Sequence, residues 1–148
     1  MNLIYPMIEK VANVLLVEDD SLDAMDVERT LRKVNANHRL YVARNGQEAL
    51  NMLRGIQVPK IDPLPSIIML DINMPKMNGL EFLEELRRDE TLKHIKVFIM
   101  TTSNQEADRT VTAKLGVSGY IVKPLKISNS PSSKDSFNLC IDLINLKK

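Results

Sequence analysis

Hydrophobic residues along the chain fall in short runs that alternate with amphipathic stretches. Five of these runs are rich in branched or large aliphatic residues and give way to polar residues, which is typical of strands buried on both faces of a parallel sheet. The expected strands are Val11–Val17, Leu40–Ala43, Ile67–Leu70, Val97–Met100 and Tyr120–Val122.

Between these runs, apolar residues recur at spacings of three and four, which predicts helices with one buried side. The first helix is expected to follow Asp20 or Ser21 as its N-cap, and the second to follow Gly46. Three more are expected at Leu80–Arg88, near Glu106–Leu115 and at Phe137–Leu146. Five strands alternating with five helices predict an α/β fold, a doubly wound five-stranded parallel sheet with helices on both faces.

The length of 148 residues fits one domain, 1–148, with an N-terminal extension over 1–12 and a Ser-rich loop plus the last helix over 128–148. The 20 Lys and Arg nearly balance the 19 Asp and Glu, so charge gives no argument for binding nucleic acid or an anionic membrane. The single cysteine excludes an internal disulfide framework. No apolar run approaches the roughly 20 residues of a membrane span. We therefore expect a soluble, cytoplasmic protein.

Polar residues follow the carboxyl ends of four expected strands, which is where ligands bind in open α/β sheets. Clustered carboxylates repel one another, by about 4 kcal/mol for two charges 4 Å apart at an effective dielectric constant of 20, so a cation must offset them. Oxygen ligands without a nearby His or Cys favour Mg²⁺. In chain order, the polar residues are Glu18, Asp19, Asp20, Asp71, Thr101 and Lys123.

Each of these residues has a simpler explanation when taken alone. An Asp after a strand is often a turn or helix cap, a Thr can cap the next helix, and a Lys before Pro is usually solvated. Their ordered occurrence at successive strand ends instead indicates a carboxylate that accepts a phosphoryl group. Asp71 stands alone at its strand end and is the expected nucleophile, while Asp19 and Asp20 are the expected metal ligands.

Four segments of the chain carry known motifs: Val14–Asp20, Leu70–Pro75 with Asn78-Gly79, Met100–Ser103 and Ser118–Pro124. Together they resemble the receiver domains of two-component response regulators. The resemblance covers Asn13 to Leu125 and implies the flavodoxin-like, CheY-like (βα)5 fold. Among receivers, the chain looks most like single-domain regulators paired with phytochrome-type or hybrid kinases.

The resemblance implies that Asp71 is the phosphoacceptor, taking its phosphoryl group from a histidine kinase or a phosphotransfer protein. Asp19 and Asp20 would hold Mg²⁺ together with Asp71 and the backbone carbonyl of Asn73. Glu18 matches a variable position of the family and is expected to lie outside the site.

The same resemblance implies roles for residues on the last two strands. Lys123 would pair with the phosphoryl oxygens, and a cis peptide bond would precede Pro124. Thr101 and Tyr120 would be the switch residues that respond to phosphorylation. Asn73 and Ser103 would tune the lifetime of the phosphoryl group.

The last helix has two apolar stripes on nearly opposite sides. The stripe of Phe137, Cys140, Ile141 and Ile144 is expected to face the sheet. The second stripe, Leu139, Leu143 and Leu146, either meets a neighbouring part of this chain or forms a face for a partner or a homodimer.

Three other functions compete with a phosphorylation switch that binds an unidentified downstream protein. A phosphohydrolase with an aspartyl-phosphate intermediate commonly has an acid two residues after the nucleophile, where this chain has Asn73. We therefore expect that the protein is a signalling switch and not an enzyme. A flavodoxin-like nucleotide binder needs a Gly- or Ser/Thr-rich phosphate loop after the first strand, where this chain has acids. An interaction domain that works without phosphorylation would not need Asp71, Lys123 and the acids after the first strand.

Overall fold

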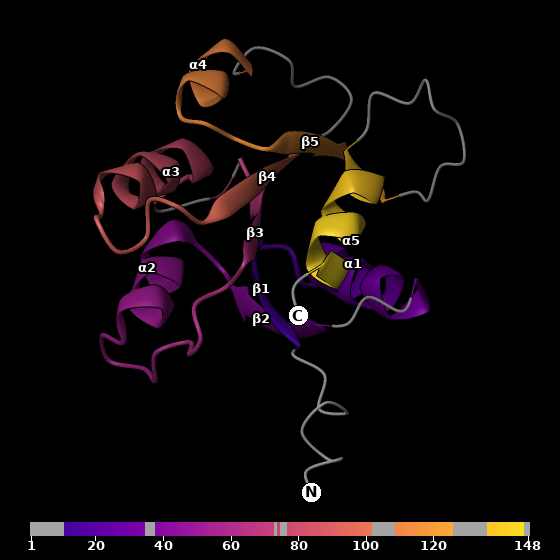
Figure 1. The fold of residues 1–148 in the computed structure, drawn as a ribbon, viewed down its shortest axis with the longest axis horizontal. Coiled ribbons are helices and arrows are strands. Elements are labelled where there is room, and N and C mark those ends of the chain that lie inside the picture. Colours follow the sequence, from indigo (N-terminus) through magenta and orange to yellow (C-terminus); the bar gives the residue numbers. More distant parts are fainter. Residues whose placement is uncertain are drawn as a thin grey trace, which may run out of the picture.

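The computed structural model describes residues 11–34, 38–72, 74, 77–101, 109–125 and 136–146, and Figure 1 shows the arrangement of the elements. The strands form one parallel sheet in the order β2-β1-β3-β4-β5, which confirms the predicted doubly wound α/β fold. The elements are β1 (Ala12–Val17), α1 (Ser21–Lys33), β2 (His38–Ala43), α2 (Gly46–Arg54), β3 (Ile67–Asp71), α3 (Gly79–Arg88), β4 (Lys96–Thr101), α4 (Arg109–Lys114), β5 (Gly119–Val122) and α5 (Phe137–Leu146).

Helices cover both faces of the sheet, which explains why its strands are continuous hydrophobic runs. On one face, α2 and α3 contribute Leu50, Leu53 and Phe82 to a cluster with alternate strand residues. On the other face, α1 and α5 pack through residues such as Leu31 and Ile144. Figure 1 shows α2 and α3 to the left of the sheet and α1 and α5 to its right.

Four strands extend beyond the predicted boundaries because pairing with a neighbour holds the extra residues. β2 begins at His38, which pairs with Ala12 of β1. β3 includes Asp71, which pairs with Met100. β4 runs from Lys96 to Thr101, and β5 begins at Gly119. The predicted start of the fourth helix at Glu106 lies outside the described residues. Since Asp71 and Thr101 belong to the strands themselves, the sheet fixes their backbones.

α5 has the predicted bounds, and its first apolar stripe packs as expected. Phe137, Cys140 and Ile144 are buried against the sheet, and burial raises the pKa of the Cys140 thiol to about 12. In the second stripe, Leu143 packs partly against the same cluster, whereas Leu139 is 47% exposed. The side chain of Leu146 lies outside the described residues.

The guanidinium group of Arg87 joins three parts of the fold at the end of α3. It donates hydrogen bonds to the backbone carbonyls of Leu115 (2.6 Å), Lys93 (3.0 Å), Ile95 (2.9 Å) and Gly116 (3.2 Å). Partial burial lowers the pKa of Arg87. One side chain therefore ties α3 to the turn before β4 and to the loop that leads into β5.

Replacing Arg87 with alanine should destabilise the protein by about 2–4 kcal/mol, because several carbonyls lose a charged donor at once. Urea unfolding followed by circular dichroism measures the loss. Arg88→Ala is the matched control, since Arg88 is 71% exposed and should cost less than about 1 kcal/mol. Equal losses in the two variants would contradict the structural role of Arg87.

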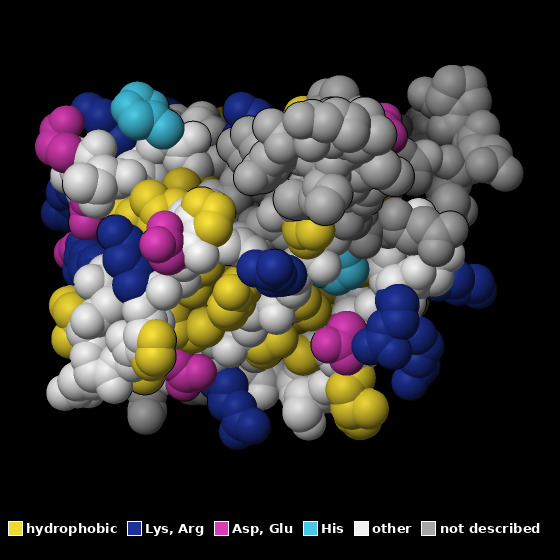
Figure 2. All heavy atoms as spheres, turned by 60° about the horizontal axis from the view of Figure 1, so that its bottom comes forward, with side chains coloured by type: hydrophobic (Ala, Val, Ile, Leu, Met, Phe, Trp, Pro, Cys, Tyr) yellow, Lys and Arg dark blue, Asp and Glu magenta, His cyan; other side chains and the backbone are white. Residues whose placement is uncertain are grey.

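Hydrophobic side chains also gather on the face that Figure 2 brings forward, with charged side chains around them. A cavity of about 470 Å³ opens at the amino-terminal ends of β3 and β4, and its lining includes Ser66, Ile67 and Lys96. This cavity is at the opposite end of the strands from Asp71.

None of the helices in the described part of the chain has the length and apolar character that crossing a membrane requires.

Candidate functional site: an acidic cluster at the carboxyl ends of the strands

Strand register brings the polar residues of separate segments to one edge of the sheet. Val17 of β1 pairs with Leu70 of β3, so the next residues, Glu18 and Asp71, lie side by side. Thr101 of β4 pairs with Val122 of β5, and the Thr101 carbonyl accepts a hydrogen bond from the Lys123 amide at 2.8 Å. Glu18, Asp71 and Lys123 therefore meet at this edge, and Thr101 ends the strand beside β5.

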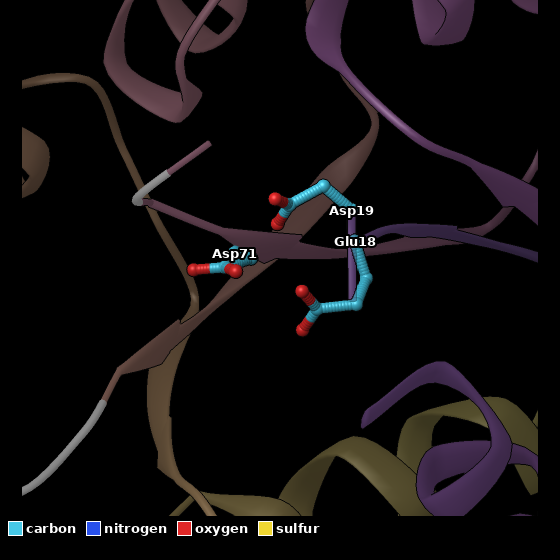
Figure 3. Close-up of side chains that lie close together, drawn as sticks. All are labelled: Glu18, Asp19 and Asp71. Atoms are coloured by element: carbon cyan, nitrogen blue, oxygen red, sulfur yellow. The ribbon is translucent and has the colours of Figure 1, made fainter. Parts of the chain in front are cut away.

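Three carboxylates form the acidic cluster, which is Glu18, Asp19 and Asp71. One oxygen of each lies within 4.8 Å of the others. Glu18 and Asp71 are buried, whereas Asp19 is exposed. Figure 3 shows the three side chains extending from the ends of β1 and β3 with their carboxylates gathered together.

Two expectations about the acids after β1 need correction. Glu18, expected outside the site, belongs to the cluster. Asp20, expected to be a metal ligand, instead caps α1, and its Oδ1 atom accepts hydrogen bonds from the amides of Leu22 (2.9 Å) and Asp23 (3.0 Å). Asp20 was one of the two predicted N-caps, and a carboxylate that caps a helix is directed to the helix amides.

Lys123 contacts two members of the cluster and a third carboxylate outside it. Its Nζ atom is 3.0 Å from Oε1 of Glu18, 3.1 Å from Oδ2 of Asp23 and 3.4 Å from Oδ2 of Asp71. Asp23 was missed in the sequence because an acid in the first turn of a helix is sufficiently explained by the helix dipole. The peptide bond between Lys123 and Pro124 is cis, as expected.

Burial and mutual repulsion set the electrostatics of the cluster. The pKa of Glu18 rises to about 7, because burial disfavours its charged form and Asp71 lies beside it. Burial alone would lower the pKa of Lys123, but its contacts with Glu18, Asp71 and Asp23 outweigh burial and raise that pKa. Lys123 is therefore a permanent cation beside carboxylates that it only partly neutralises.

The predicted switch residues lie on neighbouring strands. Thr101 is buried at the end of β4. The hydroxyl group of Tyr120, on β5, shares a 2.6 Å hydrogen bond with the hydroxyl group of Thr112, on α4. Asn73 and Ser103, predicted to tune the phosphoryl lifetime, lie outside the described residues.

A close approach of α3 to the end of β3 depends on Gly79. A Cβ atom at this position would lie 2.6 Å from Cα of Ile72 and 2.7 Å from the carbonyl oxygen of Asp71. Only glycine fits there without a backbone shift. The turn after Asp71 is thus held directly against the first turn of α3, and the Gly79 amide donates to the Ile72 carbonyl at 3.2 Å.

The donor set of the acidic cluster fits a hard divalent cation. Its members offer only carboxylate oxygens, the ligands that Mg²⁺ prefers in proteins. Together with Asp23, four carboxylates gather around the one ammonium group of Lys123, so Lys123 alone leaves negative charge uncompensated. Glu18, Asp19 and Asp71 are the described residues that would hold the ion.

In the metal-free protein, Glu18 should make stability depend on pH. Its folded-state pKa of about 7 exceeds its ordinary value of 4.5, so its contribution is fully present below pH 4.5 and lost as the pH rises through 7. The free energy of unfolding of Glu18→Gln, relative to that of wild type, should therefore rise by up to about 3 kcal/mol between pH 4.5 and pH 8. Chemical unfolding in a chelating buffer measures this gain. Glu28→Gln, at an exposed site on α1, should show no such trend, and a flat difference for Glu18→Gln would contradict the assignment.

The sheet and its acidic edge define a class of protein that comparison with known families identifies. Residues 14–130 match the response regulator receiver domain family, and the chain belongs to that family. It is 34% identical over 126 residues to response regulator Rcp1 of Synechocystis sp., a match that covers 85% of this chain and 82% of Rcp1.

Solved structures agree with this assignment. A two-component response regulator from Legionella pneumophila matches with a TM-score of 0.75 and 35% identity, covering 94% of this chain and 100% of that one. The bacteriophytochrome response regulator AtBRR matches with a TM-score of 0.74 and 30% identity, covering 94% of each. The Mn²⁺-bound form of Rcp1 matches with a TM-score of 0.64 and 29% identity, covering 90% and 89%. The expected similarity to CheY-like, phytochrome-associated regulators is confirmed.

Proposed function

We propose that this receiver domain is a switch that accepts a phosphoryl group on Asp71 from a histidine kinase or a phosphotransfer protein. The observation that carries the proposal is the convergence of Glu18, Asp19 and Asp71 with Lys123 at the carboxyl edge of the sheet. A buried aspartate beside a permanent cation and two further carboxylates has the surroundings that phosphoryl transfer to a carboxylate requires.

In the proposed step, a carboxylate oxygen of Asp71 attacks the phosphorus atom of a phosphohistidine. The oxygen–phosphorus bond forms as the nitrogen–phosphorus bond breaks, and the imidazole nitrogen leaves with the electron pair. Lys123 already contacts Asp71 and is placed to donate hydrogen bonds to the transferred phosphoryl oxygens. A bound Mg²⁺ supplies positive charge that offsets the carboxylates and the incoming phosphoryl group.

The signal then passes through Thr101 and Tyr120. We propose that the Thr101 hydroxyl turns toward the phosphoryl group and that Tyr120 changes rotamer in step with it. The hydrogen bond between Tyr120 and Thr112 supports this route, because it couples β5 to α4. Phosphorylation would thus shift the population of two arrangements of this surface.

The proposed output is the binding of a downstream protein or a second copy of the chain. Leu139, an apolar side chain that is 47% exposed on α5, supports a contact at this helix. Light scattering with and without a phosphodonor distinguishes the partners. An increase to twice the monomer mass on phosphorylation would support a homodimer, and an unchanged mass would leave a different protein as the partner.

The absence of rapid turnover is part of the proposal, since we expect only slow self-catalysed loss of the phosphoryl group. The argument rests on the sequence, which has an amide at Asn73 where a phosphohydrolase commonly has a general acid. Release of inorganic phosphate from a small phosphodonor at many turnovers per minute would favour the phosphohydrolase instead.

Intact-mass measurement after incubation with acetyl phosphate tests the central claim. With Mg²⁺, the protein should gain the mass of one phosphoryl group, and with a chelator it should gain none. Peptide mapping should locate the group in the peptide that contains Asp71. No gain under either condition, with an unchanged circular dichroism spectrum, would reject phosphoryl acceptance and leave a constitutive interaction domain.

A further inference from the structure

The ammonium group of Lys123 has three carboxylate neighbours, one for each of its hydrogen atoms. Two of them are closer to Nζ than the acceptor is, with Glu18 at 3.0 Å, Asp23 at 3.1 Å and Asp71 at 3.4 Å. Before phosphorylation, Lys123 is therefore shared between Asp71 and two other carboxylates.

Glu18 and Asp23 hold this lysine in different ways. The Glu18 side chain is fully buried, and its second oxygen accepts a hydrogen bond from the Asp20 amide at 3.2 Å. If Glu18 lost its lysine contact, its charge would be left in a dry site at high cost. The Asp23 side chain is 46% exposed in the first turn of α1, so water can replace its lysine contact. Of the two, Asp23 is the partner that can release Lys123 at little cost.

We infer that Asp23 is a positioning residue that competes with the phosphoryl group for Lys123 and thereby weakens the phosphorylated state. This inference rests on the proposed function, because it concerns the same lysine and acceptor. A phosphoryl group on Asp71 brings a charge of about −1.5 to −2 and three strong acceptor oxygens into the cluster. Lys123 already contacts Asp71, but its hydrogen bond to Asp23 directs one of its N–H groups away from these oxygens.

The direction of the effect follows from which state contains the ion pair. Removing the Asp23 carboxylate weakens the resting arrangement of Lys123 and leaves the phosphoryl contacts intact. An ion pair with a half-exposed partner has a modest strength. Loss of the pair between Asp23 and Lys123 should therefore tighten the binding of a phosphoryl analogue by about three- to tenfold.

The probe is beryllofluoride, which adds to a carboxylate oxygen and has the shape and charge of a phosphoryl group. Its affinity is measured by titration at saturating Mg²⁺ in wild type, Asp23→Asn, Asp23→Glu and Asp26→Asn. Asp26 lies on the same helix, so Asp26→Asn removes one carboxylate from α1 and reports the general effect of charge. Thermal unfolding verifies that each variant is folded.

Asp23→Asn should bind beryllofluoride three- to tenfold more tightly than wild type, while Asp26→Asn should change the affinity less than twofold. Asp23→Glu keeps the charge on a longer side chain and should restore wild-type affinity within about twofold. Weaker or unchanged binding by Asp23→Asn, or equal tightening by Asp26→Asn, would overturn the competition. If wild type binds no beryllofluoride, the proposed function itself fails, which separates the two outcomes.

Discussion

Asp71→Asn is expected to abolish phosphoryl acceptance and to leave the fold intact. An amide in place of the carboxylate has no anionic oxygen to attack phosphorus and cannot form an acyl phosphate. Asp71 is buried at the end of β3, and its backbone pairs with Met100 in a ladder that the substitution does not touch. Intact-mass measurement with acetyl phosphate and Mg²⁺ should show no added phosphoryl group.

The same substitution should change the titration of its neighbour. Because Asp71 helps to raise the pKa of Glu18, the Glu18 pKa should fall in Asp71→Asn. Carbon-detected NMR of the glutamate carboxyl groups measures this fall. Asp142→Asn removes an exposed carboxylate of α5 and should leave both phosphorylation and the Glu18 titration unchanged. A full phosphoryl gain in Asp71→Asn would reject Asp71 as the acceptor.

Lys123→Met is expected to cause the second large effect, a loss of stability of about 3–5 kcal/mol in metal-free protein at pH 8. Methionine has similar length but no charge, so Glu18 and Asp71 lose the cation that both contact. Removing one partner of a buried ion pair is costly because the other charge stays in the dry site. Urea unfolding in a chelating buffer measures the loss.

Acid should reduce this loss, because Glu18 takes up a proton when the pH falls below its pKa. That pKa is about 7 in wild type and should be higher in Lys123→Met, where the lysine contact that lowers it is gone. Mg²⁺ should also restore part of the stability at pH 8. Lys93→Met is the control, since Lys93 pairs with Glu90, which is 84% exposed, and should cost less than about 1 kcal/mol. A loss independent of both pH and Mg²⁺ would contradict the electrostatic explanation.

Local patterns in the sequence were sufficient for the order of elements and for placing Asp71 and Lys123 at one edge of the sheet. A strand buried on both faces requires a continuous apolar run, and a helix on the sheet requires apolar residues at spacings of three and four. Parallel strands also end at the same edge, so Asp71, Thr101 and Lys123 could be placed together from their positions after three of the runs. These inferences need no knowledge of which strands are neighbours.

Tertiary structure alone decided which residues complete the site, because strand register and helix direction depend on contacts distant in sequence. The pairing of Val17 with Leu70 places Glu18 beside Asp71, and the start of α1 directs Asp20 to its own helix. The same helix brings Asp23 to Lys123, one hundred residues further along the chain. Adjacent acids after a strand look equivalent in sequence, and packing gave Glu18, Asp20 and Asp23 three different roles.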